Sequence, residues 1–301
     1  MIVEMNGKEL SQKIIEQTKK DINDICIKYN IIRQPSILVI SVGYDDASNI
    51  YIRNKEKQCR NCGIIFYHQS FNEKVSRAEM IRYIQLANIS KTFDAILIQQ
   101  PLPEHLKGIE QYIDPNKDVD GFTKYNLGAL LYNKEYNDNS LVACTPLGIL
   151  ELLNEYNIKL QGKHIVIVGR SAIVGKPLIG LLLQKNATVT SCNSYTEHLK
   201  DITKTANILI SAIGKAEIIN KDYIGENCKV IIDVGMNRNK EGKLCGDVDY
   251  GDIKQSHFNA YYSTYITPVP GGVGPMTVAM LIRNIYKIFR YNIEKGLYKY
   301  E

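Results

Sequence analysis

The stretch IVIVGRSAIVGKP, residues 165–177, joins an apolar strand to a glycine-containing loop, and two phosphate-binding patterns match it in part. The Walker A pattern G-x-x-x-x-G-K-[ST] aligns with its second glycine and its lysine. The loop is one residue too long, however, and Pro177 stands where that pattern needs a Mg²⁺-binding hydroxyl. The dinucleotide fingerprint G-x-G-x-x-G also fails, because Ser171 and Val174 take its second and third glycine positions.

The surroundings of this loop decide between the two patterns. A strand at 164–169, a helix from Pro177 and a strand at 187–192 form a βαβ unit, whose helix N-terminus can receive a phosphate. An NAD-binding unit carries an acid about 20 residues on, which binds the ribose 2′-hydroxyl. Here residues 192–194 are Cys-Asn-Ser, and Arg170 stands in the loop itself. We therefore predict a dinucleotide with a 2′-phosphate.

The rest of the chain alternates apolar strands with helical segments. Strand-like runs occupy residues 36–43, 63–70, 94–101, 164–169, 187–192, 206–214 and 228–235. Near-continuous apolar strands between helices indicate parallel sheets covered on both faces. The 301 residues are enough for two cores. Helices are expected from near Pro146 and near Pro275. We predict an α/β protein with an N-terminal catalytic α/β domain, residues 1–145 with 276–301, and a Rossmann-type domain, residues 146–275.

Composition excludes several functional classes. Hydrophobic residues make up 45% and charged residues 23%, as in ordinary globular proteins, and the net charge of +5 is scattered. We expect no nucleic-acid partner and no membrane span, and the charged start of the chain favours the cytoplasm. The seven cysteines fit a reducing compartment. Cys59 and Cys62 form a single C-x-x-C without a second pair, so helix packing is preferred to a redox or zinc role.

One predicted helix carries a cation on its apolar face. A continuous stripe contains Ser48, Tyr51, Ile52, Lys55, Cys59 and Cys62, whereas Arg53, Lys57 and Arg60 lie opposite. Lys55 is therefore either a lysine snorkelling from the edge of the stripe or an amine that burial makes usable as a base.

Polar residues also end the strand at 94–101 and fill two loops. Gln99 and its neighbour Gln100 emerge at the carboxyl end of a strand, where parallel sheets bind ligands. Asp118 and Asp120 share a turn, in which an Asx-turn explains one carboxylate and a ligand ring with N–H donors suits the other. No acid or histidine cluster completes a metal site there. The loop 267–277 holds three prolines and three glycines, which suits close approach to a ligand and a cis X–Pro bond.

Together these segments resemble one family over nearly the whole chain, the bifunctional methylenetetrahydrofolate dehydrogenase/methenyltetrahydrofolate cyclohydrolases. The matching stretches are VGYDDASNIYIRNKEK, IQQPLP, DPNKDVDGF, CTPLGIL, GKHIVIVGRSAIVGKP, GDVDY and ITPVPGGVGPMT. Four positions depart from the family pattern. Gln100 replaces a leucine, Ala143 a proline, Asn193 a histidine and Tyr195 a basic residue.

The resemblance implies two domains with a cleft between them, a homodimer formed through the Rossmann domains, and a place in one-carbon metabolism and purine biosynthesis. It implies oxidation of 5,10-methylenetetrahydrofolate with NADP⁺, followed by hydrolysis of the methenyl product to 10-formyltetrahydrofolate. No metal is implied.

The resemblance also assigns residues to the two ligands. Catalytic and substrate-binding roles fall on Tyr51, Lys55, Gln99, Asp120, Pro270 and Gly271. Dinucleotide-binding roles fall on Gly169, Arg170, Ser171, Ser194, Gly274 and Thr277. In this assignment Tyr51 stacks on the folate, Lys55 is the catalytic amine bonded to Gln99, and Asp120 binds the pterin edge.

Two other functions are compatible with parts of this pattern. A dehydrogenase of the same family without cyclohydrolase activity is disfavoured by Lys55 together with Gln99. A catalytically silent nucleotide-binding sensor is disfavoured because Tyr51, Lys55 and Asp120 are all present.

Overall fold

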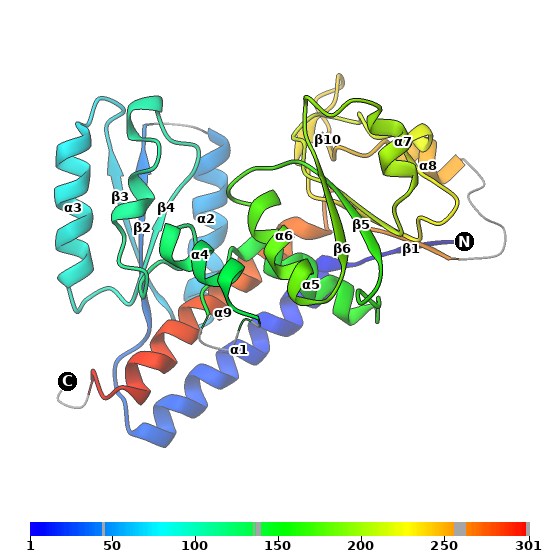
Figure 1. Ribbon diagram of the computed structural model, residues 1–301. Helices are drawn as coiled ribbons and strands as arrows, with labels where there is room; N and C mark the ends of the chain where they lie inside the picture. Colours follow the sequence, from blue (N-terminus) through cyan, green and yellow to red (C-terminus); the bar gives the residue numbers. More distant parts are fainter. Residues whose placement is uncertain (44–45, 135, 137–139, 256–262, 299–301) are drawn as a thin grey trace. The chain divides into compact units, whose positions relative to one another are not determined.

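The computed structural model describes residues 1–43, 46–134, 136, 140–255 and 263–298. The chain forms two compact units. Unit 1 comprises Met1–Ser11, Asn133–Tyr136 and Thr145–Thr277, and unit 2 comprises Gln12–Tyr132, Asn137–Cys144 and Val278–Glu301. Both combine a parallel sheet with helices (Figure 1). No described helix is long and apolar enough to cross a membrane.

Unit 2 is built on a three-stranded parallel sheet in the order β3-β2-β4. Its elements are β2 (Ser36–Val42), α2 (Asp46–Asn61), β3 (Ile65–Phe71), α3 (Arg77–Ile89), β4 (Ala95–Ile98), the short 3-10 helices η1 (Glu104–Leu106) and η2 (Ile109–Tyr112), and α4 (Lys124–Tyr132). Most of α1 (Gly7–Tyr29) and α9 (Val273–Glu294) also belongs to it.

The central strand β2 explains how unit 2 is layered. Alternate side chains of a strand point to opposite faces, and Leu38 and Ile40 pack with Met80 and Ile84 of α3. Helix α2 lies on the other side of the sheet (Figure 1). After β4, the backbone of Asp118 forms an isolated parallel β-bridge with Ile96. The turn that follows Asp118 therefore lies beside the sheet.

Unit 1 is built on a six-stranded parallel sheet in the order β1-β11-β8-β7-β5-β6. Its strands are β1 (Ile2–Glu4), β5 (His164–Val168), β6 (Thr188–Cys192), β7 (Ile208–Ser211), β8 (Val230–Asp233) and β11 (Thr264–Ile266), with an antiparallel pair β9 (Asn237–Arg238) and β10 (Leu244–Cys245). Its helices are α5 (Cys144–Glu155), α6 (Gly175–Gln184), α7 (Leu199–Lys204), η3 (Lys221–Tyr223) and α8 (Tyr250–Gln255).

The two parallel sheets and the βαβ unit around residues 165–192 confirm the predicted α/β fold class. The first residues differ from the expected division. The sequence predicts that they belong to the first domain, but Ile2–Glu4 pairs with Thr264–Ile266 and lies in unit 1. A three-residue edge strand carries no local signal for a partner at the far end of the chain.

Candidate active site

Lys55 and Gln99 form a direct hydrogen bond. The Lys55 Nζ of α2 donates to Gln99 Oε1, just after β4, over 3.0 Å. The other end of the amide is also held, because Gln99 Nε2 donates to the carbonyl of Gln100 over 2.7 Å. Since the amide nitrogen is used in this way, the oxygen must face the lysine. An uncharged acceptor therefore orients the amine.

The remaining stripe of α2 agrees largely with its predicted orientation. Ile52, Cys59 and Cys62 are buried. Arg53, Lys57 and Arg60 are exposed on the opposite side, and Lys55 is half-buried. Tyr51 differs from the inward position expected, since it remains 38% exposed. Burial of the rest of its side chain raises the pKa of Tyr51.

Cys59 of α2 and Cys62, just after the helix, are free thiols. Burial raises the pKa of Cys59 to about 12 and that of Cys62 to about 11. Thiolates are the reactive form, so these residues suit packing better than redox chemistry. Within the described ranges, no group of three or more His, Cys, Asp or Glu residues could hold a metal ion.

The structure separates the roles of the two carboxylates in the turn at 118–121. Asp118 is buried, and its oxygens accept hydrogen bonds from Phe122 N at 3.2 Å, Thr123 N at 2.8 Å and Asn126 Nδ2 at 2.9 Å. These bonds tie the turn to the start of α4. Asp118 is therefore the Asx-type structural residue.

Asp120, the second carboxylate of the turn, lies in the electrostatic field of Lys55. Burial raises the pKa of Asp120, while the charge of Lys55 and a hydrogen bond with the Cys144 thiol lower it, and Asp118 raises it. These effects act over short distances, so Lys55, Asp120 and Cys144 form one cluster in unit 2.

Cys144 and Asn284 are members of this cluster that the sequence did not single out. Burial and the neighbouring Asp120 raise the pKa of Cys144 well above its ordinary value. Asn284, fully buried in α9, donates Nδ2 to the carbonyls of Val119 at 2.9 Å and Val142 at 3.0 Å. The sequence signal that identifies Asn284 is an uncharged polar side chain on the buried, mostly apolar face of α9.

The loop after β5 requires both of its glycines. Gly169 has φ +135°, and a Cβ there would lie 2.3 Å from the carbonyl oxygen of Ala212. A Cβ on Gly175 would lie 2.2 Å from the carbonyl oxygen of Gly169. Ser171 Oγ accepts hydrogen bonds from Val174 N at 3.2 Å and Gly175 N at 3.5 Å, so it shapes the loop at the start of α6.

Polar groups surround this loop at the carboxyl ends of β5 and β6. The Arg170 guanidinium lies 6.0 Å from the ring centroid of Tyr195, and Arg170, Ser194 and Tyr195 are exposed. A guanidinium, a hydroxyl and a helix N-terminus beside close-packed glycines fit a phosphate group.

The proline-rich loop between β11 and α9 belongs to unit 1. Val269–Pro270 is a cis bond, as predicted. The Gly271 carbonyl accepts a hydrogen bond from Lys8 N at 2.9 Å, and Thr277 Oγ1 lies 3.0 Å from Thr145 Oγ1. A Cβ on Gly274 would lie 3.0 Å from Met236 Cε. The ligand contacts assigned to Pro270, Gly271, Gly274 and Thr277 remain predictions.

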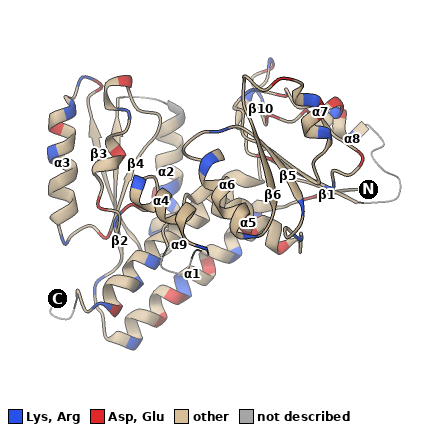
Figure 2. Cartoon of the chain, viewed as in Figure 1, with Lys and Arg blue, Asp and Glu red and all other residues tan. Residues whose placement is uncertain are grey.

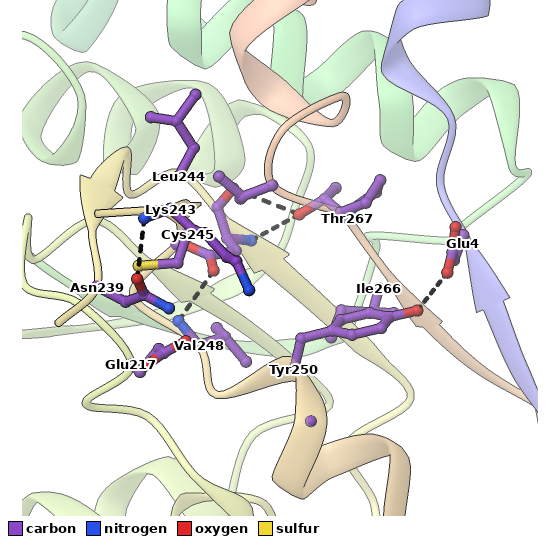
Figure 3. Close-up of a pocket in the computed structure, with 15 residues that line it drawn as sticks. Glu4, Glu217, Asn239, Lys243, Leu244, Cys245, Val248, Tyr250, Ile266 and Thr267 are labelled. Atoms are coloured by element: carbon purple, nitrogen blue, oxygen red, sulfur yellow. Dashed lines mark hydrogen bonds between the residues drawn. The ribbon is translucent and has the colours of Figure 1, made fainter. Parts of the chain in front are cut away.

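Unit 1 also contains a cavity of about 310 Å³ that none of the predicted site residues lines. Tyr250 and Glu4 are hydrogen-bonded at one side of it, and Lys243 and Glu217 contribute further ionisable groups (Figure 3). The buried Asp233 also lines it. The cavity lies between β11, the β9–β10 pair and α8.

A Rossmann-type unit with a phosphate-binding loop and a unit with a lysine–amide–carboxylate cluster define a dinucleotide-dependent α/β enzyme. Comparison with known proteins narrows this class. Residues 5–120 match "Tetrahydrofolate dehydrogenase/cyclohydrolase, catalytic domain", and residues 143–293 match the NAD(P)-binding domain of the same name. The chain belongs to the tetrahydrofolate dehydrogenase/cyclohydrolase family.

Individual relatives match over nearly the whole chain. The bifunctional protein FolD of Streptococcus thermophilus is 43% identical over 289 residues, covering 95% of this chain and 97% of the relative. The crystal structure of the bifunctional FolD dehydrogenase/cyclohydrolase from Campylobacter jejuni has 38% identity and a TM-score of 0.89, covering 97% and 100%. The Trypanosoma brucei enzyme, complexed with NADP cofactor and inhibitor, has 29% identity and a TM-score of 0.88, covering 97% and 98%.

Proposed function

We propose that the chain performs both reactions of its family at the Lys55–Gln99–Asp120 cluster. It oxidises 5,10-methylenetetrahydrofolate to the methenyl form with NADP⁺, and it hydrolyses that product to 10-formyltetrahydrofolate. The hydrogen bond from Lys55 Nζ to Gln99 Oε1 beside Asp120 is the observation that carries the residue assignment.

Oxidation of the methylene carbon leaves a cation shared between two nitrogens of the folate. A carboxylate near this product stabilises it and an uncompensated ammonium destabilises it. Gln99 holds the lysine without adding charge. Asp120, tied to the Cys144 thiol and flanked by the anchored Asp118, is positioned to accept hydrogen bonds from adjacent N–H groups of the pterin. Tyr51 offers the exposed part of its ring for stacking.

Hydrolysis requires a water molecule to lose a proton as it attacks the methenyl carbon. Lys55 Nζ accepts that proton and then returns it to the departing ring nitrogen. Gln99 keeps Nζ oriented through both transfers.

NADP⁺, when bound, accepts the hydride from the methylene carbon. The residues that would hold it are the loop around Gly169 and Ser171, the exposed Arg170 and Ser194, and in the proline-rich loop Gly274 and Thr277. Arg170 matches a 2′-phosphate bidentately.

Three further properties follow from family membership and belong to this proposal. The chain acts as a homodimer formed through unit 1, works in the cytoplasm, and supplies formyl groups for purine biosynthesis. Sedimentation of the purified protein at micromolar concentration tests the dimer directly.

Replacement of Lys55 tests the residue assignment. Lys55→Met keeps the side-chain length but removes the amine, so cyclohydrolase activity should fall by at least about a hundredfold. Dinucleotide binding and the thermal unfolding temperature should remain close to those of the wild type.

Lys57→Met is the matched control, since Lys57 is exposed on the opposite side of the same helix. Hydrolysis of methenyltetrahydrofolate by Lys55→Met at the wild-type rate would contradict the assignment. So would an equal loss in Lys57→Met.

A further inference from the structure

The motif GDVDY, residues 246–250, has no role in the reactions described so far. Its first acid, Asp247, is fully buried in unit 1. A buried carboxylate is costly unless hydrogen-bond donors surround it. Five donors converge on Asp247: Ser211 Oγ (3.0 Å) and Ile213 N (2.7 Å) on Oδ2, and Gly214 N (3.0 Å), Lys215 N (3.0 Å) and Asn237 Nδ2 (2.9 Å) on Oδ1.

Three of these donors are consecutive backbone N–H groups that follow β7. Such a run forms a concave site for an anion. Gly214 has φ +76°, which allows the chain to curl around the carboxylate. Because Asp247 already occupies this site, residues 213–215 are shaped by an internal anion and cannot use the same N–H groups for a ligand phosphate.

The curled segment contacts the loop that receives the phosphate. Ala212, directly before it, donates its N–H to the carbonyl of Val168 at 2.8 Å. The carbonyl of Ala212 packs so closely on Gly169 that a Cβ there would lie 2.3 Å away. Strands β5 and β7 are neighbours, so both segments lie at their adjoining carboxyl ends, the edge at which parallel sheets bind nucleotides.

We propose that Asp247 is a positioning residue for the dinucleotide. It fixes the backbone of residues 213–215 and, through the contact between Ala212 and Gly169, the start of the phosphate-binding loop. This inference rests on the proposed assignment of the Gly169–Gly175 loop to NADP⁺.

The Asp247→Asn variant tests it with little change in volume. The amide keeps one acceptor oxygen but turns an NH₂ group toward N–H donors, so segment 213–215 loses part of its anchor. We expect the Kd for NADP⁺, measured by calorimetry, to rise about ten- to a hundredfold. Hydrogen exchange at residues 212–215 should accelerate. Cyclohydrolase activity on added methenyltetrahydrofolate, which needs no dinucleotide, should stay within twofold.

Asp249→Asn is the matched control from the same motif. Asp249 Oδ1 accepts a hydrogen bond from Asp252 N at 2.9 Å at the start of α8 and does not bind residues 213–215. Its NADP⁺ affinity should equal that of the wild type. Ser211→Ala removes one of the five donors and provides a milder second variant, with an expected loss of a fewfold.

The outcomes separate this inference from the proposed function. An unchanged NADP⁺ Kd in both Asp247→Asn and Ser211→Ala overturns the positioning role. A parallel loss of cyclohydrolase activity in both variants also overturns it, because the role would then be general stability. A wild-type protein that fails to bind NADP⁺ would instead contradict the proposed function itself.

Discussion

Two side chains define the candidate chemistry at the scale of single residues. Lys55 is half-buried, whereas Lys57, two positions further along α2, is an exposed surface cation. The bond from Lys55 to Gln99 Oε1 holds Nζ in one direction. Gln99 is in turn held by its side-chain bond to the main-chain carbonyl of Gln100, so the side chain at position 100 takes no part in this contact.

Arg170 is the residue on which cofactor preference should depend. Losing one charged hydrogen-bonding partner costs roughly 1.5–3 kcal/mol, which corresponds to about a ten- to hundredfold change in binding. We expect Arg170→Ala to raise the KM for NADP⁺ by that factor and to change the KM for NAD⁺ much less. Steady-state dehydrogenase assays with each cofactor measure this difference.

Tyr195 adds detail to this prediction. Its ring centroid lies 6.0 Å from the Arg170 guanidinium, close enough for a cation–π contact. Arg238→Ala removes a cation from the β9–β10 pair of the same unit and serves as the control. Equal losses for both cofactors in Arg170→Ala would show that Arg170 does not bind the 2′-phosphate.

At the scale of secondary-structure elements, helix α9 links separate parts of unit 2. Asn284 donates to the carbonyl of Val119, next to Asp120, and to the carbonyl of Val142, near Cys144. The same segments touch at Gly121, where a Cβ would lie 2.8 Å from the Leu141 carbonyl oxygen. The position of Asp120 therefore depends on a helix far away in the sequence.

Asn284→Ala should disturb both stability and substrate binding. It removes the Asn284 donor from the buried Val142 carbonyl, at a cost of roughly 1–3 kcal/mol, whereas the Val119 carbonyl keeps a weaker donor, the Cys144 thiol at 3.7 Å. The KM for the folate substrate should rise while the Kd for NADP⁺ stays constant. Urea unfolding and steady-state kinetics provide the two measurements.

Asn292→Ala is a suitable comparison for this variant. Asn292 also lies in α9, but its amide donates to the hydroxyl of Tyr298 at 2.8 Å. It should lose some stability without any change in the KM for folate. If both variants had the same KM for folate, Asn284 would have no role in positioning Asp120.

At the scale of the whole molecule, the stability of unit 1 should depend on pH through Asp233. Burial raises the pKa of Asp233 to about 7. Hydrogen bonds from backbone N–H groups of Val248, Asp247 and Gly235 lower it, and the charge of Asp247 raises it. Glu4, Glu217, Lys243 and Tyr250 face the same cavity (Figure 3).

The direction of the effect follows from proton binding. An unfolded aspartate ionises near pH 4, whereas folded Asp233 keeps its proton to about pH 7. The free energy of unfolding should therefore fall between about pH 4 and about pH 7, by up to about 1.4 kcal/mol per pH unit, and level off above. Hydrogen exchange of β7 and β8 amides in urea, measured from pH 5 to pH 8, reports on unit 1.

Asp233→Asn should flatten this dependence because it removes the titrating group. Asp222→Asn is a control, since Asp222 is an exposed carboxylate of the same unit, paired with Lys200 over 2.9 Å. A wild-type slope that persists in Asp233→Asn would assign the pH dependence to another group.

Basic and acidic positions are interspersed along the described helices of both units (Figure 2). We therefore expect recognition of an anionic dinucleotide to depend more on local groups such as Arg170 than on long-range attraction from the net charge of +5.

The sequence by itself determined the features that repeat locally. Apolar strands alternating with helices predicted both parallel sheets, and the βαβ context of residues 165–192 predicted the loop after β5. Helical spacing placed Lys55 on the same face as Ile52 and Cys59. These patterns can be recognised in the sequence because the buried side chains of a strand or a helix recur at fixed intervals.

Only the tertiary structure distinguished the roles of residues that look alike in the sequence. Asp118 and Asp120 are two positions apart, and the contacts with Thr123 and Asn126 that distinguish them form only in the folded chain. The partners of Asn284 and Asp247 lie far away in the sequence, so no local pattern identifies those partners. The pairing of Ile2–Glu4 with β11 could not be predicted from the sequence for the same reason. These three features depend on long-range contacts, and local periodicity contains no information about which distant segment will supply the partner.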